Sequence, residues 1–533
     1  MIPTIQLDRH PVSSMLPSLR PLIRVASMAM ALVMPPAIAA DGAVQIPDFT
    51  KGDDIPAKAP HDWNLGPTGL RGWMFCDRLV TTDARQIAIT SVEAESPADG
   101  VLAVGDVLLG AAGRPFSTDP RTELGRAITA AETEAGGGRL VLTRWRDGTQ
   151  EEVVVHLPVL GTFSPTAPFD CPKSSRILER GLAALEAHMA APDYVRQTDG
   201  IPRCLNALAL LAGGDATHVP LVAREARWAA EFTTTGFSTW YYGYVMMLLS
   251  EYVTATGDES VLPGLRRLAL EASRGQSGVG SWGHKFALPD GRLSGYGMMN
   301  APGLPLTIGL VMARDCGVQD PEVSQAIDRS ARLIRFYVGK GAVPYGDHPA
   351  WTETHEDNGK CGMAAILFQR LGETNAADYF TRMALASHGN ERDCGHTGNF
   401  FNMTWSLPAI AQAGPQATGA WMEEFGGWYH DLARHWTGRF PHQGPPEPRN
   451  DSYADWDCTG AYLLGYALPL RKIMLTGRQA GVVPVLTATA ARSIVADGRG
   501  WTNKDRTTAY SGLSDAELVE RLGSWSPIVR ERA

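Results

Sequence analysis

The sequence lacks the features that mark several large classes of protein. Its 533 residues carry a formal net charge of −9 and no cluster of lysine and arginine. Because phosphate binding needs such clusters, no nucleic-acid partner is expected. After residue 40, no segment approaches the roughly 20 apolar residues of a membrane-spanning helix, so no span is expected in the mature chain. No convincing serine-hydrolase elbow, P-loop or dinucleotide fingerprint is present either.

Cysteine is sparse and widely spaced. The chain has seven: Cys76, Cys171, Cys204, Cys316, Cys361, Cys394 and Cys458. An odd number at such spacing fits neither a disulfide framework nor a CxxC zinc site. We therefore expect small buried apolar residues, with one or two bridges if the chain reaches an oxidising compartment.

The first 40 residues have the build of a secretory signal peptide. Arg20 and Arg24 precede the short apolar stretch VASMAMALVMPPAIAA, and small residues around Ala39 suit a cleavage site. The stretch is too short for a permanent membrane anchor, although an uncleaved signal anchor is the alternative. We expect an exported protein, periplasmic or extracellular, whose fold begins after residue 40.

The remaining chain is too long for one ordinary domain. Residues 41–61 are rich in Pro, Gly and Asp without periodicity, which is typical of a linker. Residues 62–160 then have β-type composition around one helical segment, 119–132. The segment 151–157 follows an Asp-Gly turn and is expected to form a hairpin with the strand before it.

Two segments of this region resemble a bacterial PDZ domain. They are GPTGLRGWMF at 66–75 and ESPADGVLAVGDVLLGAAGRPF at 95–116. The resemblance implies a groove in which an extended peptide adds as a strand, with bare N–H groups holding its terminal carboxylate. It places four residues in that carboxylate loop: Gly69, Leu70, Arg71 and Gly72. Arg71 is bulky for such a loop, and the alternative is a domain that braces the larger part of the chain.

Residues 174–477 consist of successive helical segments. We count twelve: 175–190, 201–213, 217–232, 238–256, 259–273, 298–316, 321–339, 358–371, 375–389, 398–413, 416–437 and 458–476. The odd-numbered segments are mostly amphipathic, whereas the even-numbered ones are apolar or small nearly all round, which predicts burial on every side. This alternation resembles the α/α toroid superfamily, the six-hairpin ring of terpenoid cyclases and prenyltransferases, with the even-numbered helices inside.

The expected fold is therefore multidomain: a small α+β PDZ-like domain, an all-α (α/α)6 toroid and a short tail. The tail, residues 478–533, contains a capping box at Ser514 and Glu517 and resembles truncated HEAT-like helices. The whole layout resembles a family of large exported bacterial proteins that is classed as a domain of unknown function. That resemblance carries no activity that can be transferred.

Polar residues cluster where three inner helices are expected to begin. If successive inner helices run in the same direction, their N-termini and the polar loops before them share one face. The candidate acid–base residues at these positions are His355, Glu356, Asp357, His396 and Asp457. Asp357 and Asp457 also stand where helix caps belong, so capping without catalysis is the structural alternative.

Aromatic and amide side chains are expected near the same face. They are Trp240, Tyr241, Tyr242, Trp282, His284, Tyr296, Asn300 and Asn399. Sugar rings stack on Trp and Tyr, while acids and His transfer protons. The first hypothesis is an exported enzyme acting on polysaccharide, by analogy with other toroids. A hydrolase needs two carboxyls about 5 to 9.5 Å apart, and a uronate lyase needs a base and a group that neutralises the carboxylate.

Two alternatives compete with this hypothesis. One is a zinc site, since Asp457, Cys458, His396, Cys394 and Cys361 are suitable ligand types. The toroidal prenyltransferases bind zinc through Asp, Cys and His, but their Asp-x-Cys spacing is absent here; no cofactor is otherwise expected. The other is a non-catalytic scaffold that binds a peptide or a glycan in the envelope. A catalytic face should hold an acid or His with a strongly shifted pKa inside a pocket.

Overall fold

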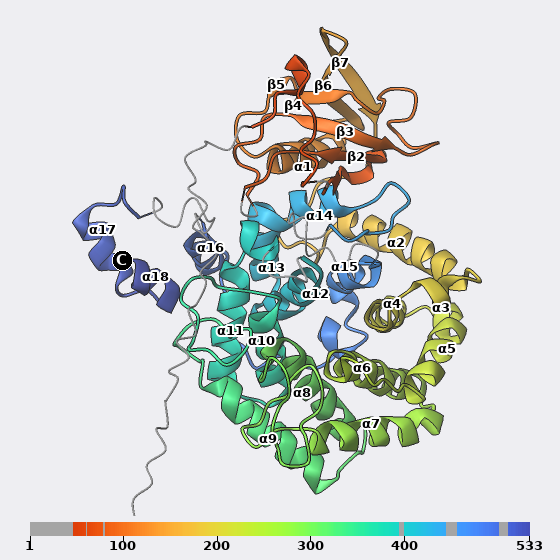
Figure 1. The fold of residues 1–533 in the computed structure, drawn as a ribbon, viewed down its shortest axis with the longest axis vertical. Coiled ribbons are helices and arrows are strands. Elements are labelled where there is room, and N and C mark those ends of the chain that lie inside the picture. The colour runs from red at the N-terminus through yellow and green to blue at the C-terminus, as the bar shows by residue number, and fades with distance from the viewer. Residues whose placement is uncertain (1–45, 60, 78–79, 394–398, 444–455, 500–509) are drawn as a thin grey trace, which may run out of the picture. The chain divides into compact units, whose positions relative to one another are not determined.

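The computed structural model describes residues 46–59, 61–77, 80–393, 399–443, 456–499 and 510–533 (Figure 1). The predicted signal peptide lies outside these residues. None of the described helices is both long enough and apolar enough to cross a bilayer.

An antiparallel sheet forms the N-terminal part of the described chain. Its strands are β1 (Trp63–Asn64), β2 (Leu70–Trp73), β3 (Ile87–Val92), β4 (Val107–Ala111), β5 (Arg114–Pro115), β6 (Arg139–Arg146) and β7 (Thr149–His156). The strand order is β1-β2-β3-β4-β6-β7, and β5 pairs with β4. The predicted hairpin is present: β6 and β7 are joined by Asp147 and Gly148, both with positive φ.

Helix α1 (Pro120–Ala131) closes one face of this sheet. Asp119 caps its first turn by accepting from the Arg121 amide, and Pro120 occupies the first helical position. Leu124 and Ile128 are buried in the apolar cluster of the sheet domain. The other side of α1 packs on α14 (Gly427–Ala433), where the sheet meets the helical domain (Figure 1).

The rest of the described chain is mainly helical. The remaining helices are α2 (Pro172–Ala190), α3 (Tyr194–Gln197), α4 (Gly200–Gly213), α5 (Val219–Ala230), α6 (Ser238–Thr256), α7 (Leu262–Arg274), α8 (Asn300–Asp315), α9 (Pro321–Arg335), α10 (Lys360–Arg370), α11 (Thr374–Ala386), α12 (Asn399–Ile410), α13 (Pro415–Trp421), α15 (Thr459–Tyr466), α16 (Ala488–Asp497), α17 (Asp515–Arg521) and α18 (Pro527–Arg532). The predicted order of a small α+β domain followed by an all-α domain is confirmed. The single helix predicted over 416–437 is instead α13 and α14, separated by a π-helical turn at Met422–Gly426.

Six of these helices contact one another in a closed circuit, which we call the helical ring: α4, α6, α8, α10, α12 and α15. They are the segments whose apolar character predicted burial on every side. Helices α2, α5, α7, α9 and α11 each pack against two successive members of the ring. In α10, for example, every residue from Lys360 to Phe368 is buried.

Neighbouring helices of the ring run in the same direction. The backbone of Gly359 lies against Phe401, and that of Gly362, one turn later, lies against Trp405. The same register relates α6 to α8 and α12 to α15. The N-termini of these helices therefore share one side of the ring.

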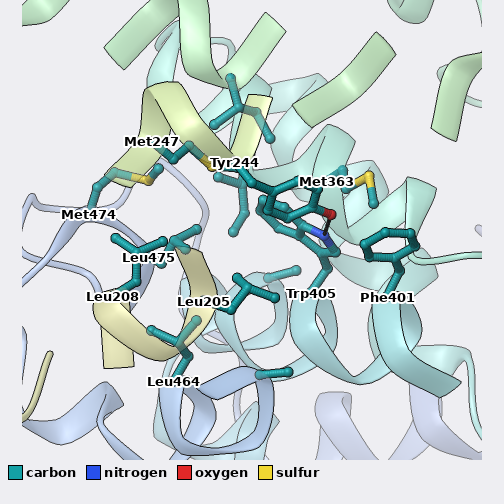
Figure 2. Close-up of a cluster of buried hydrophobic side chains, with 14 of the residues drawn as sticks. Leu205, Leu208, Tyr244, Met247, Met363, Phe401, Trp405, Leu464, Met474 and Leu475 are labelled. Atoms are coloured by element: carbon teal, nitrogen blue, oxygen red, sulfur yellow. Dashed lines mark hydrogen bonds between the residues drawn. The ribbon is translucent and has the colours of Figure 1, made fainter. Parts of the chain in front are cut away.

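The interior of the ring is filled by large apolar side chains (Figure 2). Tyr244 of α6 stacks on Phe401 of α12 with ring centroids 5.6 Å apart, and Trp405 donates to the Tyr244 hydroxyl over 3.2 Å. Leu205, Met363 and Leu464 from three further ring helices join the same cluster. The centre of the ring is thus packed core, and a substrate has to bind elsewhere.

Candidate functional site

The predicted acidic cluster before α10 is a buried helix cap. Both carboxylate oxygens of Glu356 accept backbone N–H groups, from Asp357 at 2.8 Å, Cys361 at 3.0 Å and Gly362 at 2.9 Å. The prediction that Asp357 caps this helix is wrong, because its carboxylate instead pairs with Lys360 at 2.7 Å. Burial raises the pKa of Glu356, and nearby Arg392 opposes that rise. The N-terminus of α10 is therefore satisfied internally.

His355 joins the cluster to the C-terminal tail. Its Nε2 lies 3.0 Å from Ser526 Oγ, and its Nδ1 lies 3.6 Å from Glu391 Oε1. This is the connectivity of a Ser–His–acid triad. All three residues are buried, however, and Ser526 Oγ already accepts from Val529 N as the cap of α18. The arrangement anchors the tail and leaves no room for a substrate.

Asp457 borders a cavity of about 610 Å³ between the sheet and the helices, which we call the junction cleft. The sheet domain contributes Asn64, Arg71 and Glu93. The helical domain contributes Ala184, Ala187, His188, His435, Thr437, Arg439, Pro441, His442, Trp456 and Asp457. Of the predicted acid–base residues, the structure thus places Asp457, itself buried, on the wall of a cavity, and His396 lies outside the described residues.

Asp457 is held by several donors at once. Its Oδ1 accepts from the amide and the hydroxyl of Thr459, at 3.1 and 2.5 Å, which caps α15 as predicted. Its Oδ2 accepts from Asn206 Nδ2 at 3.0 Å and lies 3.5 Å from Arg439 Nη2. These donors hold the carboxylate in a fixed position.

His188 and Arg439 lie beside each other on the wall of the junction cleft. Arg439 Nη2 lies 3.1 Å from His188 Nε2, and that nitrogen lies 3.6 Å from Asp457 Oδ2. Burial and the positive charge of Arg439 lower the pKa of His188 below its ordinary value of 6.5. His188 is therefore neutral at pH 7, and its Nε2 lone pair points toward the guanidinium.

A carboxylate from the sheet domain completes the wall. The two oxygens of Glu93 lie 2.8 and 2.9 Å from His435 Nε2, and Trp436 Nε1 donates to Glu93 over 2.7 Å. Burial alone would raise the pKa of Glu93, but these hydrogen bonds lower it below its usual value. Glu93 therefore stays ionised.

Some of the predicted aromatic and amide residues make internal hydrogen bonds, and others lie at the surface. Trp282 and Asn300 are buried and donate to backbone carbonyls, Ala272 O at 2.8 Å and Pro344 O at 2.9 Å. Tyr296 is exposed. The hydroxyls of Tyr241 and Tyr242 bind the carboxylates of Asp199 and Glu271. Asn399 begins α12, and its side chain lies outside the described part.

Trp240 belongs to a series of aromatic contacts that reaches the junction cleft. It donates to His284 Nδ1 over 3.0 Å and stacks on Phe401 at 6.0 Å between ring centroids. Phe401 in turn contacts Trp456, which lines the cleft. A continuous aromatic path thus connects the predicted aromatic face with the cavity.

The edge of β2 that a peptide would extend is already paired. Strand β1 is hydrogen-bonded to it, with Trp63 opposite Gly72 and Asn64 opposite Arg71. The Arg71 guanidinium binds Asp62 at 2.6 Å. An added methyl at Gly69 would overlap Ser96 at 2.1 Å. The predicted peptide site at Gly69, Leu70, Arg71 and Gly72 is therefore closed by the chain's own β1 strand.

The proposed zinc ligands are dispersed. Asp457 and Cys458 stand at the start of α15, Cys361 lies in α10, and Cys394 and His396 lie outside the described residues. Within the described chain there is no group of three or more His, Cys, Asp or Glu side chains placed to hold a metal ion. Cys458 Sγ lies 3.7 Å from His442 Nδ1, but burial raises the pKa of this thiol, which stays protonated. Cys171, Cys204 and Cys361 are likewise buried free thiols.

Comparison with known proteins gives one match. The sequence profile described as Domain of unknown function (DUF6288) matches residues 174–477, from α2 to the segment after α15. This range includes the helical wall of the junction cleft. No curated protein and no solved structure matches the chain.

Proposed function

We propose a function for this chain, which belongs to the family described as Domain of unknown function (DUF6288). The protein is an exported enzyme that cleaves a uronate-containing polysaccharide by elimination in the junction cleft. One observation carries this proposal: a neutral histidine, His188, lies 3.1 Å from a guanidinium, Arg439, on the wall of one cavity.

Elimination requires the two functions that this pair supplies. A base removes the proton from the carbon beside the uronate carboxylate, and a cation stabilises the charge that develops on that carboxylate. The bond to the leaving oxygen then breaks, a carbon–carbon double bond forms, and the leaving oxygen takes a proton. Arg439 would bind the carboxylate, His188 would remove the proton and, once protonated, would return it to the leaving oxygen.

Substrate binding would also activate the base. In the free protein an Arg439 N–H points at the Nε2 lone pair of His188. A substrate carboxylate is a stronger acceptor than a neutral imidazole, so it would draw that N–H away and release the lone pair. The base would thus become available when a uronate is in place.

The carboxylates of the cleft favour elimination over hydrolysis. Glycoside hydrolysis needs one protonated carboxylic acid whose pKa is raised. Hydrogen bonds hold the pKa of Glu93 below its usual value, and both oxygens of Asp457 are already occupied as acceptors, from Thr459 and Asn206. Neither carboxyl is suited to donate the proton that hydrolysis requires.

The same proposal includes two specific fold assignments, the α/α toroid and the PDZ-like domain. The closed circuit of six helices supports an α/α toroid, and the sheet with α1 supports a PDZ-like domain that braces the toroid. In this view the brace supplies Glu93 and Arg71 to the cleft, while Trp456 offers an aromatic face to a sugar ring.

The experiment is a turnover assay on uronate-containing polysaccharides with the purified mature chain. Elimination creates a conjugated double bond that absorbs ultraviolet light, whereas hydrolysis creates new reducing ends without that absorbance. We expect absorbance to rise, and His188→Ala and Arg439→Ala to abolish the rise. His348→Ala, an exposed histidine outside the cleft, is the matched control. Reducing ends without absorbance, or full turnover by Arg439→Ala, would overturn the proposal.

A glycan-binding scaffold is the second candidate. The observation that favours it is the packed interior of the ring, with the start of α10 used for internal contacts. A scaffold predicts saturable binding of polysaccharide with no new double bonds and no new reducing ends.

A further inference from the structure

A second cavity, of about 740 Å³, lies at the other end of the ring, and we call it the C-terminal cavity. Its walls include the last residues of α8 and α10 and the segment 471–485 that follows α15. Gln369 tethers that segment, since it donates to Ala480 O at 3.3 Å and accepts from Val482 N at 3.0 Å. Met474 and Leu475 line the cavity and also belong to the buried cluster of the ring interior (Figure 2). The volume lies within the usual range of small-molecule sites.

Three arginines line this cavity, and two of them are balanced by the chain's own carboxylates. Arg370 pairs with Asp315, and Arg478 pairs at 2.8 Å with the buried Glu251. Arg471 is an exposed residue of the lining and has no ion pair or side-chain hydrogen bond among the described residues. The cavity therefore carries one uncompensated positive charge, which suits an anion.

Two buried polar atoms of lining residues also lack partners in the described part of the chain. They are the Nε donor of Arg370 and the Oε1 acceptor of Gln412. Buried polar groups in native proteins are normally hydrogen-bonded, so each one requires an explanation. Both atoms have almost no solvent-accessible surface in this structure, so a ligand that accepts at Arg370 and donates at Gln412 would satisfy both once the side chains that cover them move aside.

The backbone conformation of Arg471 also favours a binding role for this residue. This residue has φ of +50°, in the left-handed region, just after η8 (Leu468–Leu470). Glycine is the residue that adopts this conformation without strain, and it is the usual choice after a helix. An arginine there retains strain that a role for its side chain would offset.

We infer that the C-terminal cavity binds a small hydroxylated oxyanion, such as a sugar acid, with Arg471 as its principal cation. The oxyanion accepts from Arg471 and from Arg370 Nε, and a hydroxyl donates to Gln412 Oε1. This site is separate from the junction cleft. The two cavities lie at opposite ends of α15, whose eight residues span about 12 Å.

The test is calorimetric titration of the full mature chain with sodium D-glucuronate, with acetate and glucose as probes that each lack one of the two groups. We expect Arg471→Gly and Arg471→Ala to weaken glucuronate binding at this site about tenfold or more, the loss of one charge-assisted hydrogen bond. Arg471→Gly should also unfold at an unchanged or higher temperature without ligand, because glycine relieves the strain. This separates a binding role from a structural one.

Two further variants keep the outcomes distinct. Arg292→Gly, on an exposed loop, controls for the loss of a surface charge, and Arg439→Ala removes the junction cleft's cation. Binding that survives Arg439→Ala and fails in both Arg471 variants supports the inference, whatever the fate of the proposed elimination activity. No glucuronate binding, or binding lost only in Arg439→Ala, overturns it. A response to acetate equal to that of glucuronate overturns the hydroxyl contact at Gln412.

Discussion

Four buried charges join the sheet domain to the helical domain, and removing one of them should destabilise the protein strongly. Lys173 Nζ lies 2.6 Å from Asp431 Oδ2 and 3.0 Å from Glu132 Oε2, and Arg434 pairs with both carboxylates. The side chains of Lys173, Asp431 and Glu132 are wholly buried, and that of Arg434 is 5% exposed. Two positive and two negative charges balance one another in a buried region.

The variant Lys173→Met would leave two buried carboxylates with one cation. Breaking a buried pair on one side costs about 3 to 5 kcal/mol, because the remaining charge is desolvated and uncompensated. We expect the free energy of unfolding to fall by about that amount in chemical denaturation, with an unchanged denaturant slope. Lys51→Met is the matched control, since Lys51 pairs with Asp48 at the surface, and it should change stability little.

The same variant has a predictable pH dependence. Burial alone would raise the pKa of Asp431, but Lys173 and Arg434 hold it below its ordinary value. A depressed carboxyl pKa stabilises the fold above the unfolded pKa of about 3.9, and this stabilisation is lost as the pH falls through the folded pKa. Lys173→Met removes much of that contribution, so its deficit should shrink as the pH falls below about 4. A deficit below about 1 kcal/mol at pH 7, the range of surface pairs, would refute this account of the junction.

Three further predictions concern the ends of the ring. Glu356→Ala removes the acceptor of three backbone N–H groups and should cost about 3 kcal/mol in denaturant unfolding, whereas a loss under about 1 kcal/mol would contradict its capping role. Ser526→Ala removes the cap of α18 and the contact with His355, so amide exchange in α18 should accelerate while that in α10 stays unchanged. The pKa of His188, measured by nuclear magnetic resonance, should lie below its ordinary value and should rise in Arg439→Met. An unchanged pKa in this variant would exclude an interaction between the two residues.

The polar residues before α10 show why sequence position alone misleads about chemistry. A buried helix start has unpaired N–H groups that need acceptors, and Glu356 meets that need. Arg392 is buried beside it, donates to the backbone carbonyl of Ser387, and has its pKa lowered to about 10 by burial. Asn402 of α12 accepts from Gly359 N at 2.6 Å and ties the two helices together. A cluster of ionisable residues can thus stabilise the packing of helices in a ring.

Periodicity and composition were sufficient to predict the architecture of this chain. Helices that are apolar on every side, such as 358–371, must be buried, and alternation with amphipathic helices predicts two layers. The Asp-Gly turn at 147–148 likewise acts through neighbours in the chain, so local sequence suffices to predict it. The division of 416–437 into two helices by the π-helical turn at Met422–Gly426 was not predicted, because the periodicity of the segment continues across the turn.

Only the tertiary structure brings the residues of the junction cleft together. Asp457 was recognisable from its place before a buried helix, but His188 sits near the end of an amphipathic outer helix, where nothing in the sequence distinguishes it from a surface residue. Glu93 lies in a different domain, more than 340 residues from its partner His435. The role of each depends on charges brought together across the chain, because an electrostatic interaction is set by distance in space and by burial, and neither follows from spacing along the sequence.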